Sequence, residues 1–135
     1  MPIIEFSKED FLQSKVVEPA WYRVLIEKVE DRLSKDGKST NTWLNGKILF
    51  NSDTGSEENA GVPTPLWLFN SKATWNVVGF AKAFGMEPAP GKRFDPAATV
   101  GKSIDVFIDN EMYEGVLKNS IKHKYREPRQ PVQQG

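Results

Sequence analysis

The side chains of this sequence that could engage a ligand are aromatic rings and lysines on strand-like segments. Trp43 and Lys47 alternate with apolar residues in one such segment, and Trp67 and Phe69 do so in the next. An outward indole ring can stack on a nucleic-acid base, and a neighbouring lysine can meet a phosphate. Two alternatives stay open: Trp43 packs beneath the N-terminal segment or the long loop at 51–65, and the strand with Trp67 is buried on both faces.

Lysines recur at even positions near the C-terminal end, at Lys118, Lys122 and Lys124. On a strand, such residues project from one face, where they could follow the phosphates of an extended single strand. Lys35 and Lys38 flank an Asp-Gly turn and add two flexible cations near the same surface. The alternative is a solvated edge strand whose lysines oppose edge-to-edge aggregation.

Two more residues complete the candidate binding set. Tyr113 lies in the turn before the last strand, and Arg23 lies on the strand face opposite Tyr22 and Val24. The expected stacking residues are Trp43, Trp67, Phe69 and Tyr113. The expected phosphate contacts are Lys35, Lys38, Lys47, Lys118, Lys122 and Lys124, with Arg23 as a weaker contributor.

No pattern in the sequence predicts catalysis. The single histidine, His123, has no serine or cysteine motif around it, and no phosphate-binding glycine loop or HExxH motif occurs. Asp105 and Asp109 share a strand face and could hold a divalent cation, although turn chemistry and a solvated surface explain them better. We therefore predict a protein without catalytic residues, cofactor or metal.

Length and charge limit the class of protein. The chain has 135 residues, a formal net charge of zero and no cysteine, so it predicts one domain without disulfides or zinc–thiolate sites. Residues 116–135 contain five basic and one acidic side chain, whereas residues 1–60 contain eight basic and eleven acidic ones. This asymmetry predicts a positive field near the last strand. Without a long apolar run or a signal peptide, we expect a cytoplasmic protein that does not enter a membrane.

Periodicity and turn residues predict the elements that must position these side chains. Alternation of apolar and polar residues predicts strands over 21–33, 40–51, 66–70, 103–109 and 115–125. Spacing of Trp75, Val78, Ala81 and Phe84 predicts a helix over 72–84 that ends at Gly85. We expect an N-terminal arm (1–19), in which Phe6, Phe11 and Leu12 could dock, a core domain (20–125) and a flexible tail (126–135).

This order of elements is that of an all-β fold with one helix. Five strands with the helix between the third and fourth predict a five-stranded Greek-key barrel of the oligonucleotide-binding (OB) type. In that fold, the face of strands 2 and 3 and the loops joining strands 1–2 and 4–5 bind oligonucleotides or oligosaccharides. The candidate residues occupy these places.

Several segments resemble a phage family of predicted single-stranded DNA-binding replication proteins. The segments are Trp21–Val24, Lys35–Ser39, Asn70–Gly85, Val100–Lys102 and Tyr113–Asn119, within a resemblance that covers about residues 20 to 125. It implies an OB-fold protein of the phage replication or recombination module, located in the host cytoplasm. Many such proteins end in an acidic tail that recruits partners, but this chain ends in Gln130–Gly135. That departure puts recruitment through such a tail in doubt.

We therefore expect a largely sequence-independent single-stranded DNA-binding protein that protects DNA during replication or recombination. Replication or recombination proteins and further copies of the chain are candidate partners. The main alternative is a protein-interaction module, or a phage structural or assembly protein, with an aromatic docking face. A carbohydrate-binding barrel would also use exposed tryptophans, but it has no need of the lysines. Salt separates these functions, because phosphate binding weakens steeply with ionic strength and apolar docking does not.

Overall fold

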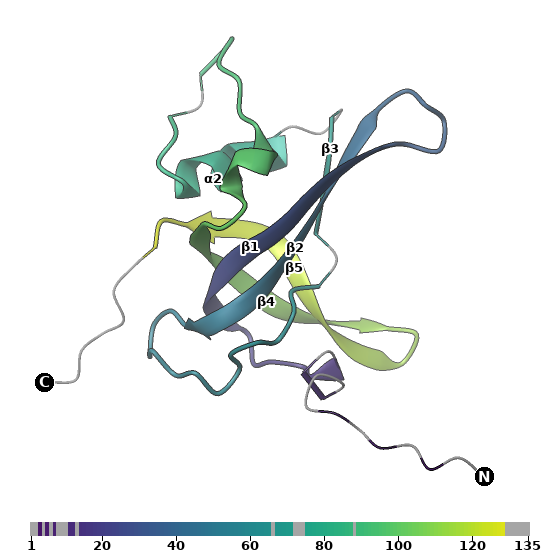
Figure 1. Ribbon diagram of the computed structural model, residues 1–135, viewed down its shortest axis with the longest axis vertical. Coiled ribbons are helices and arrows are strands. Elements are labelled where there is room, and N and C mark those ends of the chain that lie inside the picture. The colour runs from purple at the N-terminus through teal and green to yellow at the C-terminus, as the bar shows by residue number, and fades with distance from the viewer. Residues whose placement is uncertain are drawn as a thin grey trace, which may run out of the picture.

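Five strands, with a helix between the third and the fourth, form most of the described part of the protein (Figure 1). The computed structural model describes residues 3, 5, 7, 11, 12, 14–65, 67–71, 75–87 and 89–128. Its elements are β1 (Ala20–Leu33), β2 (Thr40–Asn51), β3 (Trp67–Asn70), α2 (Trp75–Ala83), the 3-10 turn η1 (Pro96–Thr99), β4 (Ser103–Tyr113) and β5 (Val116–Arg126). The predicted order, with the helix between the third and fourth strands, is confirmed.

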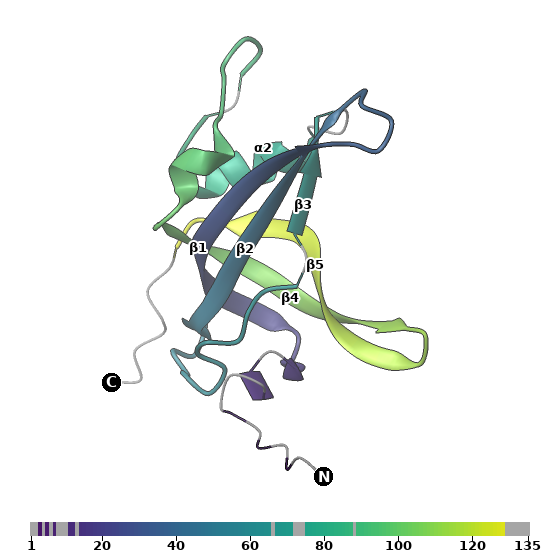
Figure 2. The same ribbon diagram turned by 45° about the vertical axis from the view of Figure 1, so that its right-hand side comes forward.

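The strands form one antiparallel sheet in the order β3-β2-β1-β4-β5. β1 is the centre of this sheet because it pairs with β2 from Tyr22 to Leu33 and with β4 through residues 20–25. The sheet curls, so that β1 and β2 cross above β4 and β5 in Figure 2. This is the strand order of an OB-type barrel, although no backbone ladder joins β3 to β5 among the described residues.

A glycine and two bulges allow β1 to bend between the two halves of the sheet. The pairing of β1 with β2 shifts between Arg23 and Val24 and again between Ile26 and Lys28. Beside these shifts, a Cβ added to Gly46 would lie 2.7 Å from the carbonyl oxygen of Leu25. Only glycine permits this close approach, and bulges sharpen the twist of a strand. The local sequence therefore produces the curl that gives the sheet an inside and an outside.

Alternate residues of the strands fill the inside. Tyr22, Val24 and Ile26 of β1 are buried, and the odd residues between them are only half-buried. The same alternation buries Leu44 and Ile48 of β2. Ile104, Val106 and Ile108 of β4 complete the inner layer. Since successive side chains of a strand point to opposite faces, the remaining residues of these strands form the outer surface.

Helix α2 covers one open end of the curled sheet. The aromatic residue that it buries there is Phe80, which was not among the residues used to predict the helix. Phe80 is fully buried, and its ring centroid lies 5.4 Å from that of Trp67 and 5.1 Å from that of Phe69. Of the residues whose spacing predicted the helix, Ala81 is buried and Val78 is 41% exposed. The predicted C-terminal glycine is confirmed: Gly85 has φ +84° and lies in the turn that ends the helix, one residue beyond Phe84.

Side chains, not a backbone ladder, join the free edges of β3 and β5. The indole ring of Trp67 stacks on Tyr125 with ring centroids 5.7 Å apart, and Trp67 Nε1 donates a hydrogen bond of 2.8 Å to Tyr125 Oη. His123 Nδ1 lies 2.8 Å from the same hydroxyl oxygen, and its ring contacts Phe69. We call Trp67, Phe69, His123 and Tyr125 the β3–β5 seam.

The β4–β5 hairpin is longer than the sequence predicted. We expected a strand that ends at Asp109 and a turn over 110–114, but β4 continues to Tyr113. The turn consists of Glu114 and Gly115, which both have positive φ, at +48° and +78°. Such two-residue turns match the twist of paired strands. The polar residues at 110 and 111 therefore belong to the hairpin ladder and not to its turn.

The segment before β1 lies against this hairpin. Val17 is buried, its amide donates to Asn119 Oδ1 at 2.9 Å, and its carbonyl accepts from Asn110 Nδ2 at 2.9 Å. Leu12 packs against the core, but Phe11 is 65% exposed, so its predicted docking is wrong. Phe6 and residues 129–135 lie outside the described part of the chain.

Candidate nucleic-acid interface

The predicted stacking residues of β3 are part of the core. Trp67 and Phe69 are 1% and 3% exposed, so the prediction that they stack on bases is wrong. Both faces of this short strand are apolar, and the sequence does not show which one Phe80 of α2 covers. Because Phe80 contacts the rings of Trp67 and Phe69, that face turns inward and Leu68 turns outward, half-buried.

Trp43 does lie on the outer face of β2, as predicted. It is half-buried, and it pairs across the sheet with Glu30 of β1 and Leu68 of β3. Lys47 lies on the same strand but is also half-buried, because the segment around Pro63 bridges to it. Glu30, directly opposite Trp43, is paired with Arg32 at 3.0 Å and with Lys28 at 3.9 Å, so the cations on this part of the surface already have a carboxylate partner.

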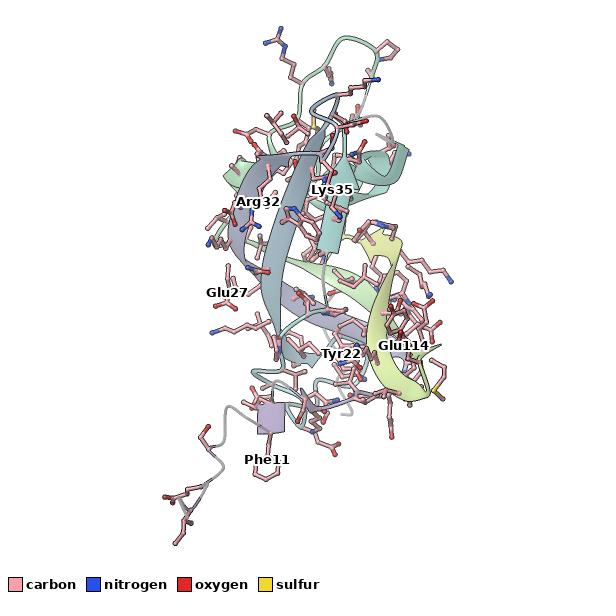
Figure 3. The ribbon with its side chains drawn as sticks, turned by 90° about the vertical axis from the view of Figure 1, so that its right-hand side faces the viewer. Phe11, Tyr22, Glu27, Arg32, Lys35 and Glu114 are labelled. Carbon is pink, nitrogen blue, oxygen red and sulfur yellow. The ribbon has the colours of Figure 1, made fainter. Side chains whose placement is uncertain are left out.

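Lys35 and Lys38 are exposed in the β1–β2 turn. That turn lies apart from the β4–β5 turn, as the positions of Lys35 and Glu114 in Figure 3 show. The structure therefore does not bring the two predicted lysine groups together. The lysines of β5 must be considered with their own neighbours on β4 and β1.

Four contacts between a cation and an aromatic ring lie on the outer face formed by β1, β4, β5 and the end of β2. Arg126 lies 4.4 Å from the ring centroid of Trp21, and Arg23 lies 5.1 Å from that of Phe50. Lys124 lies 5.4 Å from Phe107, and Lys118 lies 5.2 Å from Tyr113. We call these eight residues the cation–aromatic stripe: Trp21, Arg23, Phe50, Phe107, Tyr113, Lys118, Lys124 and Arg126.

The strand register places the stripe on a single face. Trp21 pairs with Phe107, Arg23 with both Phe50 and Asp105, and Asp105 with Arg126. Directly paired residues of an antiparallel sheet project from the same side. Phe107 and Tyr113 are both odd-numbered residues of β4, so they share the side of Asp105. The rings of Trp21 and Phe107 also touch edge to face, with centroids 5.5 Å apart.

The lysines of β5 face outward, as predicted, even though β5 contains a bulge. The register with β4 shifts between Val106 and Ile108, where His123 has φ +57°. His123 points into the seam, whereas Lys122 and Lys124 remain exposed. Lys122 Nζ lies 3.3 Å from Glu111 Oε2, and Lys118 is paired in register with the same residue.

A buried carboxylate lies beneath the stripe. Asp105 has no exposed surface, and its two oxygens accept hydrogen bonds from Arg23 Nε at 2.7 Å and Arg126 Nε at 3.0 Å. The hydroxyl of Ser52 donates to the same carboxylate. The hypothetical cation site at Asp105 is therefore wrong, because two guanidinium groups already occupy its oxygens.

The cations of the stripe lie close to carboxylates that offset much of their charge. Partial burial alone would lower the pKa of Arg126, but hydrogen bonds to Asp53 and Asp105 outweigh it and raise that pKa above its ordinary value. Arg126 is therefore always charged. The carboxylates of Asp53, Asp105 and Glu111 lie beside these cations and beside Lys122. The stripe thus carries fixed, oriented cations with a modest net charge.

This arrangement matches the chemistry of a single-stranded nucleic acid. Aromatic rings offer stacking surfaces for unpaired bases, and arginine and lysine heads within reach of those rings can bind the phosphates between them. Of this stripe, the sequence predicted Arg23, Tyr113, Lys118 and Lys124. Trp21, Phe50, Phe107 and Arg126 were not predicted, although Trp21 and Phe107 lie at outward positions of alternating strands, which was an available signal.

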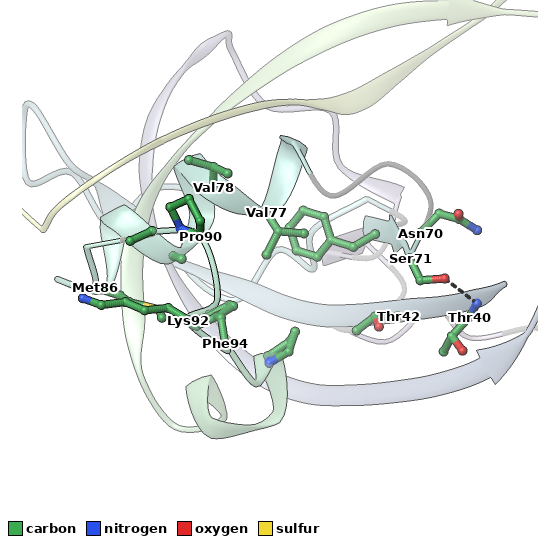
Figure 4. Close-up of a pocket in the computed structure, with 14 residues that line it drawn as sticks. Thr40, Thr42, Asn70, Ser71, Val77, Val78, Met86, Pro90, Lys92 and Phe94 are labelled. Carbon is green, nitrogen blue, oxygen red and sulfur yellow. Dashed lines mark hydrogen bonds between the residues drawn. The ribbon is translucent and has the colours of Figure 1, made fainter.

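Two other surface features consist mainly of apolar side chains. A cavity of about 560 Å³ lies between the start of β2, the end of β3, α2 and the segment 86–96 (Figure 4). Its floor is apolar, with Phe69, Val77 and Phe94, and Lys92 at its rim donates to the carbonyl of Glu87. The tip of the β4–β5 hairpin exposes four large apolar side chains, namely Met112, Tyr113, Val116 and Leu117.

Comparison of this sequence with models of known protein families and with curated proteins gave no match. The resemblance to phage single-stranded DNA-binding proteins therefore rests on the sequence segments named above and stays a prediction. No helix within the described ranges is long and apolar enough to cross a membrane. Those ranges also hold no cluster of three or more histidine, aspartate or glutamate side chains arranged for a metal ion.

Proposed function

We propose that the protein binds single-stranded DNA, largely independently of sequence, and protects it during DNA replication or recombination. The observation that carries this proposal is the set of four cation–aromatic contacts on one outer face. Bases would stack on Trp21, Phe50, Phe107 and Tyr113, and phosphates would bind Arg23, Lys118, Lys124 and Arg126. The proposal assigns binding to this face and no catalytic step.

The cations that cover the rings have a role in this proposal. A lysine ammonium above the ring of Tyr113 or Phe107 is held near that ring, and it can move aside toward a phosphate when a base takes its place. In this exchange the ring gains a base as its partner, and the cation gains a phosphate. Duplex DNA cannot take part in the exchange, because the faces of its paired bases are stacked inside the helix.

Titration of fluorescently labelled oligo-dT, duplex DNA of equal length and oligo-U at two salt concentrations tests the proposal. We expect the tightest binding for oligo-dT and a loss of affinity as salt rises. Equal affinity for duplex and single strand would contradict base stacking and leave simple attraction of phosphates. Tighter binding of oligo-U than of oligo-dT would indicate that the ligand is single-stranded RNA and not DNA.

The exposed hairpin tip favours a second candidate function, the docking of a protein partner. Large apolar side chains that gather at one exposed place often mark interaction sites. Here Met112, Val116 and Leu117 lie around Tyr113. A complex with a replication or recombination protein bound at this tip would persist as salt is added. Leu117→Ser would abolish this protein docking without changing the salt dependence of DNA binding.

A further inference from the structure

Four groups hold Arg126 on the surface of the stripe. Its Nε lies 3.0 Å from Asp105 Oδ2, and its Nη2 lies 2.6 Å from Asp53 Oδ1 and 3.4 Å from Ser52 Oγ. Its guanidinium carbon lies over the ring of Trp21. The side chain is only 17% exposed. Arg126 therefore already has two carboxylate partners in the free protein, where a nucleic-acid phosphate would have to bind.

The two carboxylates differ in how firmly they are held. Asp105 is fully buried and is shared with Arg23 and Ser52, so it cannot leave without exposing unpaired charges. The side chain of Asp53 is 53% exposed and has Arg126 as its ion-pair partner. An ion pair with an exposed carboxylate is weakened by water and salt, so Asp53 is the exchangeable ligand of the two.

The backbone around Asp53 fixes where its carboxylate lies. Ser52 is buried, and its amide donates to the carbonyl of Trp21 at 2.9 Å. Asn51 Oδ1 accepts from the amides of Asp53 at 2.9 Å and Thr54 at 3.1 Å. These contacts anchor the main chain beside the stripe and leave only the Asp53 side chain to rotate away from Arg126.

A carboxylate and a phosphate present similar oxygen pairs to a guanidinium group. We propose that Asp53 occupies, in the free protein, the place on Arg126 that a phosphate of the bound strand takes, and so acts as a built-in competitor. The inference rests on the proposed function. On binding, a phosphate oxygen replaces Asp53 Oδ1 at Nη2, while Nε of Arg126 stays on Asp105.

The consequence is that Asp53 lowers the affinity for a single strand. Asp53→Asn removes the negative charge from the competing oxygen, and we expect about two- to fivefold tighter binding of oligo-dT at low salt, the range of an exposed ion pair. Glu57→Gln is the matched control, because Glu57 is exposed in the same loop and the change alters the net charge equally. General electrostatics would tighten binding by the same factor in both variants.

Arg126→Gln shows whether the effect passes through Arg126. We expect Asp53→Asn to have no further effect when combined with Arg126→Gln, because the competitor then has nothing to block. An Asp53→Asn variant that binds oligo-dT no more tightly than Glu57→Gln does would overturn the proposal. An Asp53→Asn substitution that raises the affinity for oligo-dT equally in the parent and in Arg126→Gln would also overturn it.

Inorganic pyrophosphate, measured by calorimetry, separates this proposal from the proposed function. We expect Asp53→Asn to bind pyrophosphate more tightly than the parent and Glu57→Gln. If no variant binds oligo-dT while this gain appears, the proposed function is wrong and the exchange of Asp53 for phosphate stands. If neither ligand distinguishes Asp53→Asn from Glu57→Gln, the competitor role is wrong.

Discussion

Phe107 and Trp43 are outward aromatic residues with different neighbours. Phe107 lies beneath Lys124 within the stripe, whereas Trp43 pairs across the sheet with Glu30 outside it. We predict that Phe107→Leu weakens oligo-dT binding by about 1–3 kcal/mol, the contribution of one stacked base. Trp43→Leu should weaken it less, because Trp43 lies outside the stripe that is proposed to bind the DNA strand. Anisotropy titrations measure both affinities.

The two leucine variants serve as controls for each other, since each replaces one half-buried aromatic residue on the outer face. Circular dichroism and urea unfolding establish that both remain folded. A greater loss for Trp43→Leu than for Phe107→Leu would restore the β2–β3 face as the binding surface. It would also remove Phe107 from the stacking set.

The β3–β5 seam predicts how stability depends on pH. Burial lowers the pKa of His123 below its ordinary value of 6.5, because desolvation opposes the charged form. Between the folded and unfolded pKa values, the unfolded chain therefore binds more protons than the folded one. We predict that the free energy of unfolding falls as the pH drops from about 7 through this window, with slope set by proton linkage.

His123→Asn isolates this contribution. Asparagine tolerates the positive φ of this position and does not titrate, so the variant should lose part of the pH dependence even if it is less stable throughout. Urea unfolding at pH 5, 6, 7 and 8 measures the difference in slope. Parallel curves for parent and variant would show that His123 is protonated equally in the folded and unfolded chains.

Strands with one buried face could be predicted from the sequence because alternation and turn residues agree there. The segment 40–51 is β2 with the bounds expected, and 21–33 differs from β1 by one residue. The β4–β5 turn was misplaced because Asn110 and Glu111 have turn-like side chains. The position of the turn depends instead on backbone conformation, and two consecutive positive φ values occur at Glu114 and Gly115.

The candidate site was predictable only in part, because a surface depends on which strands become neighbours. Alternation alone places Arg23 and the lysines of β5 outward. The contact of Arg23 with Phe50 and that of Arg126 with Trp21 require the register of β1 with β2 and the approach of β5 to β1. Likewise, Trp67 turns inward because Phe80, from a helix later in the chain, packs against it.

The whole molecule has no net charge, so its affinity for a polyanion depends on where its charges lie. The cations of the stripe are interleaved with Asp53, Asp105 and Glu111. Under the proposed function, such a surface would bind phosphates at fixed positions and attract them only weakly from a distance. We therefore expect a bound single strand to be released readily as salt rises.

The three lysines of β5 give the last prediction, which concerns the salt dependence of the whole interaction. Lys118, Lys122 and Lys124 are exposed on the outward face, and each neutralised phosphate of a single strand contributes about 0.7 to the slope of log affinity against log salt. Replacing all three by glutamine should weaken oligo-dT binding and flatten that slope by about two. Glutamine at Lys28, Lys82 and Lys92, which are exposed outside the stripe, changes the net charge equally and should leave the slope nearly unchanged. If the lysines only guard an edge strand, the first variant would instead bind normally and aggregate more. A monodisperse triple variant with the parent's affinity and slope would remove these lysines from the interface.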